Sequence, residues 1–204
     1  MRNNLSNGHN TPPDPQSPAT PTLSVLLTIG HSTLPIEDFL ELLQTYGIQV
    51  LADVRITPYS RRNPQFHSGA LAKSLANAGI QYWHMPALGG RRKTIPDSVN
   101  LGWRNESFRG YADYMQTREF WNALDDLMAT AQRLPLTIMC AEAVPWRCHR
   151  TLISDALVRR GWRVRHIISA NSLQTHALTP FAKFEDGRLI YPAEGPQDST
   201  LPFF

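Results

Sequence analysis

Residues 136–150 read Leu-Thr-Ile-Met-Cys-Ala-Glu-Ala-Val-Pro-Trp-Arg-Cys-His-Arg. The apolar run 136–139 predicts a strand, and the amphipathic stretch 152–158 that follows predicts a helix. Both cysteines, a histidine, a carboxylate and two arginines lie between them. Open α/β sheets bind their ligands where strands end and helices begin, so this segment predicts both the fold class and the place of a site.

The same strand, loop and helix order recurs along the chain. Apolar runs predict strands at 25–29, 50–54, 80–83, 136–140 and 163–168, and a hairpin around Asp186-Gly187 at 184–191. Helical patterns begin at Pro35 and end at Gly47, then recur at 69–78, as one or two helices in 108–134, and at 148–160. Strands that alternate with helices pair in parallel. The sequence therefore predicts a three-layer, Rossmann-like α/β domain with about five mainly parallel strands.

Two segments lie outside this pattern. Residues 1–22 hold five of the sixteen prolines and few apolar residues, which predicts a disordered tail ahead of one α/β domain over 23–204. Residues 84–107 form a long connection rich in Gly, Pro and Arg. Connections of this length in a compact domain are binding loops, lids or disordered segments.

The charge of the chain is unevenly distributed. From Arg55 to Arg109, nine Lys or Arg residues accompany only Asp97 and Glu106, a net charge of +7; the whole chain carries +3, so the remainder sums to −4. This uneven distribution favours a phosphate-bearing small molecule or a nucleic acid as partner, against the alternative of a solvated basic surface.

No apolar run reaches the about 20 residues of a membrane helix, and two cysteines without a secretory signal favour the cytoplasm.

Polar side chains follow the strands that we place centrally. His31 follows the first strand, Asp53 and Arg55 end the second, and Cys140 and Glu142 end the fourth. The carboxyl ends of parallel strands share one edge, so these side chains are expected to converge. Taken singly, a histidine beside a glycine turn or an aspartate at a loop is more often structural than catalytic.

The two cysteines admit several roles. Cys140 precedes Arg147 by seven residues, one more than the Cys-x5-Arg signature of tyrosine phosphatases, and the loop lacks glycine and carries Glu142. A buried structural thiol and a catalytic nucleophile both remain open for Cys140. Cys140, Cys148 and His149 lack the Cys-x2-Cys pairs of structural zinc sites, and a fourth ligand would come from as far as His31 or His84. We therefore predict no metal ligand, and keep a thiol–metal or redox site as an alternative.

A set of short motifs resembles the "domain of unknown function 488" family. The motifs are Gly30-His-Ser, Asp53-Val-Arg, Pro58-Tyr-Ser-Arg, Leu88-Gly-Gly, Phe108-Arg-Gly-Tyr and Cys140-Ala-Glu with Cys148-His-Arg, in consistent order from about residue 25 to 170. The resemblance implies an α/β fold and a shared polar pocket, without a settled activity. Matched to the family motifs, the pocket candidates are His31, Asp53, Arg55, Ser60, Arg61, Glu142, Cys148, His149 and Arg150.

These observations favour a pocket that binds a phosphate-bearing ligand, a nucleotide or nucleic acid, in a hydrolase or transferase. Arg55, Arg61 and Arg150 would hold the anion, with Ser60, Cys148 and His149 beside them; His31, Asp53 or Glu142 would supply acid–base catalysis and Cys140 a nucleophile. The main alternative is a non-catalytic nucleic-acid-binding module, in which Tyr59, Phe66 and Trp103 stack on bases. The sequence names no cofactor and sets no oligomeric state.

Overall fold

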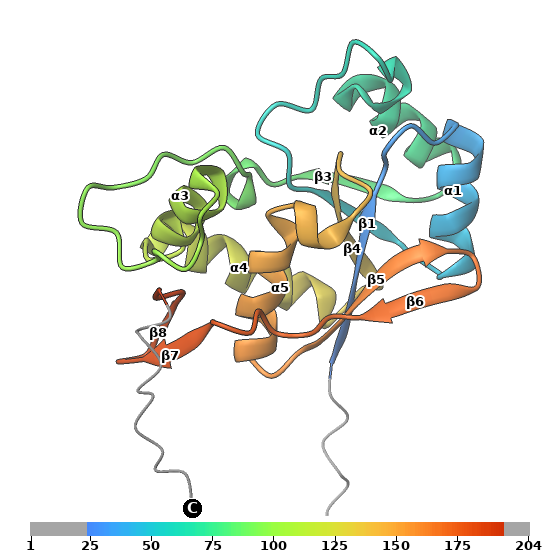
Figure 1. Ribbon diagram of the computed structural model, residues 1–204. Helices are drawn as coiled ribbons and strands as arrows, with labels where there is room; N and C mark the ends of the chain where they lie inside the picture. The colour runs from blue at the N-terminus through green and yellow to red at the C-terminus, as the bar shows by residue number, and fades with distance from the viewer. Residues whose placement is uncertain (1–23, 194–204) are drawn as a thin grey trace, which may run out of the picture.

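A six-stranded sheet runs through residues 24–193, the part of the chain that the computed structural model describes (Figure 1). Its strands are β1 (Val25–Gly30), β2 (Val50–Asp53), β3 (Gln81–His84), β4 (Leu136–Cys140), β5 (Arg163–Ser169) and β6 (Ser172–Thr175), in the order β3-β2-β4-β1-β5-β6. The first five in this order pair in parallel, and β6 pairs antiparallel with β5.

Helices cover both faces of the sheet. The helices α1 (Ile36–Thr45) and α2 (Ser68–Asn77) pack on one face, with Phe39, Leu43 and Leu71 in the hydrophobic cluster that also holds Ile29 of β1. On the other face lie α3 (Glu106–Tyr114), α4 (Arg118–Ala131) and α5 (Arg150–Arg159), with Leu26 of β1 in their cluster. Alternate side chains of β1 thus enter different cores, which confirms the predicted three-layer α/β architecture.

Short elements connect these layers. Three short 3-10 turns lie in the connections: η1 (Pro64–Phe66), η2 (Pro86–Leu88) and η3 (Pro145–Arg147). The strands β7 (Lys183–Glu185) and β8 (Arg188–Ile190) form the predicted hairpin, where Asp186 and Gly187 both adopt positive φ. This hairpin is a separate two-stranded sheet.

The strand β4 lies between β1 and β2, although in the sequence it begins only at Leu136, long after β1 ends at Gly30 and β2 at Asp53. Gly30 pairs with Cys140, and Asp53 with Met139. The pairing continues past the strand ends, because His31 N donates to Cys140 O at 3.0 Å and Ser32 N to Ala141 O at 2.9 Å. A Cβ atom on Gly30 would overlap the Glu142 carbonyl, so glycine allows the chain after β4 to cross β1 closely.

Three details of the prediction need correction. The sheet has a sixth strand, β6, which the sequence pattern missed. The one or two helices predicted over 108–134 are two, and the first of them begins at Glu106, two residues earlier than predicted. The helix α5 begins at Arg150, after η3, two residues later than predicted. The tail predicted for 1–22 lies outside the described residues. Among residues 24–193, no helix combines the length and the apolar composition needed to cross a bilayer.

Candidate functional site

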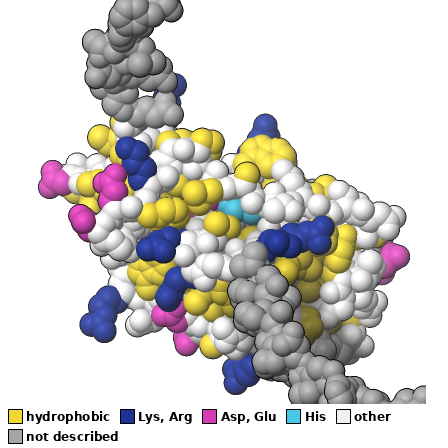
Figure 2. All heavy atoms as spheres, turned by 90° about the horizontal axis from the view of Figure 1, so that it is seen from below, with side chains coloured by type: hydrophobic (Ala, Val, Ile, Leu, Met, Phe, Trp, Pro, Cys, Tyr) yellow, Lys and Arg dark blue, Asp and Glu magenta, His cyan; other side chains and the backbone are white. Residues whose placement is uncertain are grey.

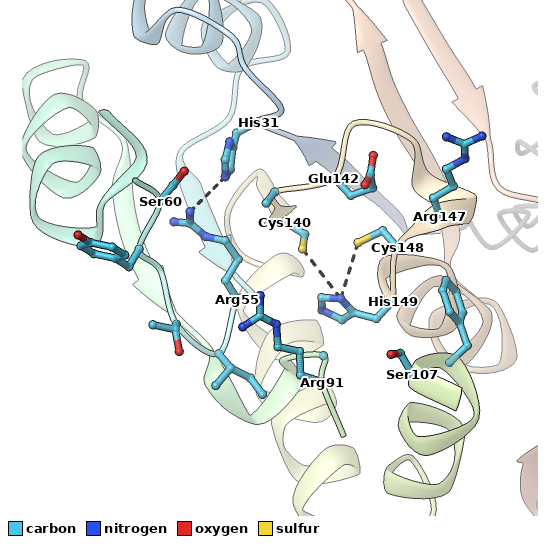
Figure 3. A pocket seen from close by; sticks show the side chains of 16 residues that line it. His31, Arg55, Ser60, Arg91, Ser107, Cys140, Glu142, Arg147, Cys148 and His149 are labelled. Atoms are coloured by element: carbon cyan, nitrogen blue, oxygen red, sulfur yellow. Dashed lines mark hydrogen bonds between the residues drawn. The ribbon is translucent and has the colours of Figure 1, made fainter. Parts of the chain in front are cut away.

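A pocket of about 370 Å³ opens at the carboxyl ends of β1, β2 and β4 (Figure 3). Its walls come from the loops after these strands, from the start of α3 and from the segment that connects β4 to α5. Seven of the predicted site residues line it: His31, Arg55, Ser60, Cys140, Glu142, Cys148 and His149. The volume lies within the range of small-molecule sites.

Arg55 is fixed rigidly in one wall of the pocket. Its Nε and Nη2 atoms donate to the two carboxylate oxygens of Asp53 at 2.8 and 2.6 Å, and Nη2 also donates to Phe66 O. Tyr82 donates its hydroxyl proton to the same carboxylate. Asp53 is fully buried, so it acts from behind the wall as the counter-ion that orients Arg55.

His31 completes the support of Arg55. Its Nδ1 atom lies 2.9 Å from Ser32 O, a group that only accepts, so Nδ1 carries the proton and Nε2 accepts from Arg55 Nη1 at 3.1 Å. Its ring stacks on Phe66. Burial, and next the charge of Arg55, lowers the pKa of His31 to about 4. The neutral imidazole has both nitrogens engaged, which suits it to hold Arg55 in place.

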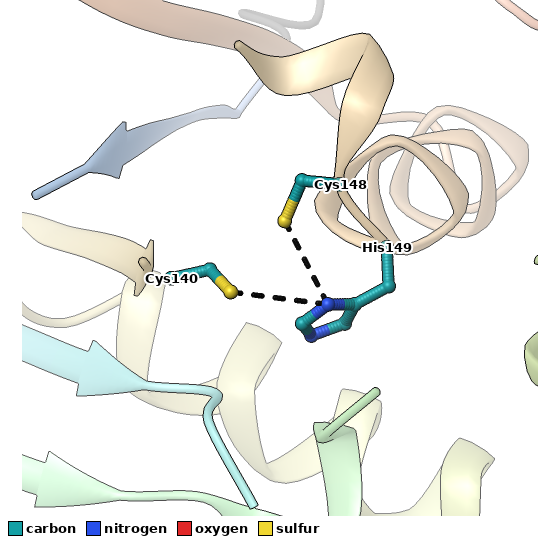
Figure 4. Close-up of side chains that lie close together, drawn as sticks. All are labelled: Cys140, Cys148 and His149. Atoms are coloured by element: carbon teal, nitrogen blue, oxygen red, sulfur yellow. Dashed lines mark hydrogen bonds between the residues drawn. The ribbon is translucent and has the colours of Figure 1, made fainter. Parts of the chain in front are cut away.

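Cys140, Cys148 and His149 gather on the facing wall (Figure 4). The Nδ1 atom of His149 lies 3.9 Å from Cys140 Sγ and 3.7 Å from Cys148 Sγ. The hydrogen bond from the Cys140 thiol lowers the pKa of Cys148 well below its usual value, assisted by the charge of Arg150. The same shared proton and burial raise the pKa of Cys140. Cys148 is therefore the more acidic of the two thiols, and the predicted nucleophile Cys140 the less acidic one.

Arg150 lies under the segment that carries these cysteines. Its side chain is 1% exposed and donates to Cys148 Sγ, to Thr28 Oγ1 and to the carbonyl oxygens of Glu142 and Ala143. Four of its five N–H groups are used in this way. Arg150 thus holds the loop after β4 in place from the interior of the protein. It does not line the pocket, so it is not the anion-binding arginine that the sequence predicted.

A chain of hydrogen bonds continues from Arg150 into the protein interior. Asp155 only accepts, so His176 donates to it from Nε2 at 2.8 Å, and His176 Nδ1 lies 3.2 Å from His166 Nε2. His166 Nδ1 in turn lies 2.7 Å from the Thr28 hydroxyl oxygen. Burial, followed by the coulombic effect of His176, lowers the pKa of His166 to about 3, so His166 is neutral in this arrangement.

Other predicted residues lie elsewhere. Arg61 is exposed and outside the pocket wall. Phe66 is buried against His31, and Trp103 packs against Phe108, Phe181 and Tyr191, so neither offers a face for a base. Tyr59 does line the pocket and is 60% exposed.

The pocket also contains residues that the sequence did not single out as ligand contacts. They are Arg91, Ser107 and Phe108 from the long 84–107 connection and the start of α3, and Arg147 from η3. For Arg91 and Ser107, the feature of the sequence that pointed to a role in binding was the unusual length of the 84–107 connection. Gly90 lies directly against the ring of His149, where a Cβ atom would come within 3.0 Å of Nδ1.

Part of the positive charge of residues 55–109 interacts with other side chains of the same domain. Arg55 pairs with Asp53, Arg109 pairs with Glu106, and the Arg92 guanidinium lies 3.7 Å from the centre of the Tyr114 ring. On the face shown in Figure 2, where β1 begins, Lys and Arg side chains are separated by hydrophobic and neutral groups among the described residues. That face, opposite the pocket, offers no continuous basic stripe.

The comparisons with known proteins are sparse. A family model described as "Domain of unknown function DUF488" matches residues 35–157, more than half of the chain. The matched range contains Arg55 and the Cys140–His149 wall of the pocket. No curated protein and no solved structure matches the chain.

Proposed function

Because this chain belongs to the family described as domain of unknown function DUF488, a description that states no activity, we propose its function from its own pocket. We propose that the pocket binds a small phosphate-bearing ligand of nucleotide type and presents it to Cys148 and His149 for hydrolysis or transfer. The observation that carries this proposal is the position of the immobilised Arg55 guanidinium opposite the thiolate–imidazole pair in one cavity.

The donors on the Arg55 side suit a phosphate. Four N–H groups of Arg55 are engaged by Asp53, Phe66 and His31, which leaves one Nη1–H on a guanidinium that cannot rotate. The Ser60 hydroxyl accepts from Asn63 N and keeps its own proton to donate. The Arg91 side chain extends toward Arg55 in Figure 3 and forms no ion pair within residues 24–193. Charge-assisted donors fixed before binding lose little entropy on it.

An aromatic surface accompanies these donors. The Tyr59 ring lines the pocket, is held by His67 with 4.2 Å between the ring centroids, and leaves most of its surface to solvent. Phe108 lines the pocket near Ser107. A flat ring beside phosphate donors favours a nucleotide over inorganic phosphate, because a base stacked on an aromatic side chain contributes about 1–3 kcal/mol.

The reactive groups occupy the other wall. The Cys148 thiolate is stabilised by Arg150 and faces His149 Nδ1, and Glu142 places an exposed carboxylate in the same pocket. A thiolate, an imidazole and a carboxylate around one ligand are the groups that hydrolases and transferases use for proton transfer and nucleophilic attack. Glu142 is the acid–base candidate among them, since His31 is fully engaged with Arg55.

A ligand-dependent melting screen tests the proposal. Nucleoside mono-, di- and triphosphates, the matching nucleosides and inorganic phosphate are compared on the wild type and on Arg91→Gln. A nucleotide at 100 times its dissociation constant should stabilise the wild type by about 2.7 kcal/mol, and Arg91→Gln should bind it at least tenfold more weakly. Arg61→Gln is the matched control, because Arg61 lies outside the pocket and its loss should leave binding unchanged. Equal shifts for nucleosides and nucleotides, or none, would contradict the proposal.

A non-catalytic nucleic-acid-binding module is the second candidate, favoured by the exposed aromatic rings of Tyr59 and Trp146. It predicts retention of single-stranded DNA or RNA at low salt and a steep loss of affinity at higher salt, with no turnover. An electrophoretic shift at two salt concentrations separates the two candidates, because the pocket proposal requires no retention of long strands.

A further inference from the structure

Two sulfur atoms and one imidazole nitrogen converge at the wall of the pocket. Cys140 Sγ, Cys148 Sγ and His149 Nδ1 all lie within 4.8 Å of one another, and both sulfur atoms face Nδ1 in Figure 4. With metal–sulfur bonds of about 2.3 Å and a metal–nitrogen bond of about 2.0–2.1 Å, bond angles of about 109–125° separate sulfur from nitrogen by about 3.5–3.9 Å. The sulfur–nitrogen distances of 3.7 and 3.9 Å fall in this range.

The imidazole presents the correct nitrogen for a metal ligand. His149 Nε2 lies 3.3 Å from the carbonyl oxygen of Val54, which only accepts, so the proton resides on Nε2. Nδ1 is then unprotonated and directs its lone pair toward the two sulfur atoms. Metal-binding histidines characteristically donate their second nitrogen to a carbonyl or carboxylate in this way.

The three groups are held by separate parts of the fold. Cys140 ends β4 in the middle of the sheet, and Cys148 is held by the buried guanidinium of Arg150. His149 lies between the Tyr111 ring, with centroids 5.1 Å apart, and the backbone of Gly90. Packing from several directions therefore sets the ligand geometry before any ion binds.

We propose that Cys140, Cys148 and His149 bind one divalent cation of the zinc class, with the fourth coordination position open to the pocket. Two thiolates and an imidazole select zinc among the abundant divalent ions. Three protein ligands with one free position are typical of catalytic rather than structural zinc sites. All three residues line the pocket, so the fourth position faces the space where the ligand would bind. This proposal revises the sequence-based expectation of no metal ligand.

The role of the ion rests on the proposed function, whereas its binding does not. In the zinc form Cys148 and His149 are metal ligands, so a water would take the place of the Cys148 thiolate as the attacking group. An open zinc position polarises an oxygen of a bound phosphate or acidifies a bound water. Glu142 lines the same pocket and would be the residue that accepts the proton of a water that attacks the ligand. The substrate then contributes the leaving group, and the proton returns to it from Glu142.

Metal content of the purified full chain tests the binding directly. After equilibration with zinc and removal of the excess, we expect about one zinc per chain in the wild type and less than a tenth of that in Cys148→Ala and His149→Gln. His84→Gln is the matched control, because His84 ends the neighbouring strand β3 but lies outside the cluster, and it should retain the ion. Circular dichroism of each variant establishes that it is folded.

A second measurement uses the wild type alone and so does not depend on the folding of variants. Cobalt added to the zinc-free protein should produce thiolate charge-transfer absorption and the strong visible bands of tetrahedral coordination. Zinc should slow labelling of both cysteines at least tenfold, and a chelator should restore it. Octahedral cobalt spectra, zinc retained by Cys148→Ala, or equal thiol labelling with and without zinc would each overturn the proposal, as would a Cys140–Cys148 disulfide in protein kept under reducing conditions.

The two proposals fail in different ways. Zinc binding without a nucleotide-dependent melting shift would support the metal site and reject the proposed ligand. A nucleotide-dependent shift that persists unchanged in metal-free protein, together with no zinc binding, would support the ligand and reject the metal.

Discussion

The guanidinium of Arg150 lies 3.5 Å from Cys148 Sγ, and no Asp or Glu of residues 24–193 lies within ion-pair distance of it. A charge that is 1% exposed is rarely left without a counter-ion. A thiolate on Cys148 meets this need, and after the hydrogen bond from Cys140 the charge of Arg150 is among the causes that lower the pKa of Cys148. The charge of the buried Arg150 and the acidity of Cys148 in the pocket wall are therefore coupled.

Arg150→Met should lower the free energy of unfolding by about 2–4 kcal/mol, because the partly buried carbonyls of Glu142 and Ala143 and the buried Thr28 hydroxyl lose their donor. Urea unfolding of the metal-free protein measures this loss. Arg147→Met removes an exposed arginine from the same segment and should change stability by less than about 0.5 kcal/mol. Similar losses in both variants would show that Arg150 does not support the loop.

Asp53→Asn should lower the free energy of unfolding by more than its conservative character suggests. The substitution leaves Arg55 buried without its counter-ion, which costs about 3–5 kcal/mol in comparable buried pairs. Asp125→Asn is the control, since Asp125 pairs with Arg160 on the surface, where an ion pair contributes about 0–1 kcal/mol. Chemical denaturation of the two variants side by side should give a clear difference, and equal stabilities would refute the role of Asp53.

Gly90→Ala should disturb the site while sparing the core. A Cβ atom at this position would lie 3.0 Å from His149 Nδ1, so the ring must shift by a few tenths of an ångström and its alignment with the two cysteines changes. We expect a loss of at least tenfold in zinc and nucleotide affinity. Gly69→Ala places its methyl group in open space within α2 and should be neutral or stabilise by up to about 1 kcal/mol. Unchanged affinities in Gly90→Ala would indicate that the ring has room to adapt.

Stability should fall as the pH falls from neutrality. The pKa values of His31 and His166 are lowered to about 4 and about 3, below the 6.5 of the unfolded chain. Below about pH 6.5 the unfolded state binds these protons first, so stability is lost down to pH 4 for His31 and pH 3 for His166. The slope for each group is at most about 1.4 kcal/mol per pH unit. His166→Asn should reduce the slope measured between pH 7 and pH 5; an unchanged slope would exclude His166 as a contributor.

The parallel part of the fold could be read from the sequence because buried strands are continuous apolar runs. The predicted bounds of β4 agree with the structure, and Pro35 and Gly47 flank α1 as expected. The strand β6 could not be recognised, because Ser172–Thr175 is a mostly exposed edge strand with Leu173 as its one apolar residue. Its pairing with β5 comes from the local turn and not from an apolar pattern.

The pocket was predicted in place but not in detail. Strand ends identified the pocket residues His31, Arg55 and Cys140, and Asp53 behind them, because parallel strands bring their carboxyl ends together. The sequence could not show which arginines turn inward, and so it treated Arg150 and the exposed Arg61 alike. The sequence named Cys140, Cys148 and His149 together but could not show that their ligand atoms converge, since Cys140 and His149 are nine residues apart and meet only through the loop that Arg150 supports.

The position of β4 between β1 and β2 determines when this pocket can form during synthesis. A nascent chain that ends before Leu136 carries β1 and β2 with their facing edges unpaired and a gap one strand wide between them. Unpaired edges recruit strands from other chains, so such intermediates depend on chaperones or on rapid completion to avoid aggregation. When β4 pairs with both β1 and β2, it joins the two parts of the sheet and brings Cys140 beside His31. Ligand-binding capacity should therefore appear late and all at once, and no amino-terminal fragment that lacks β4 can have it.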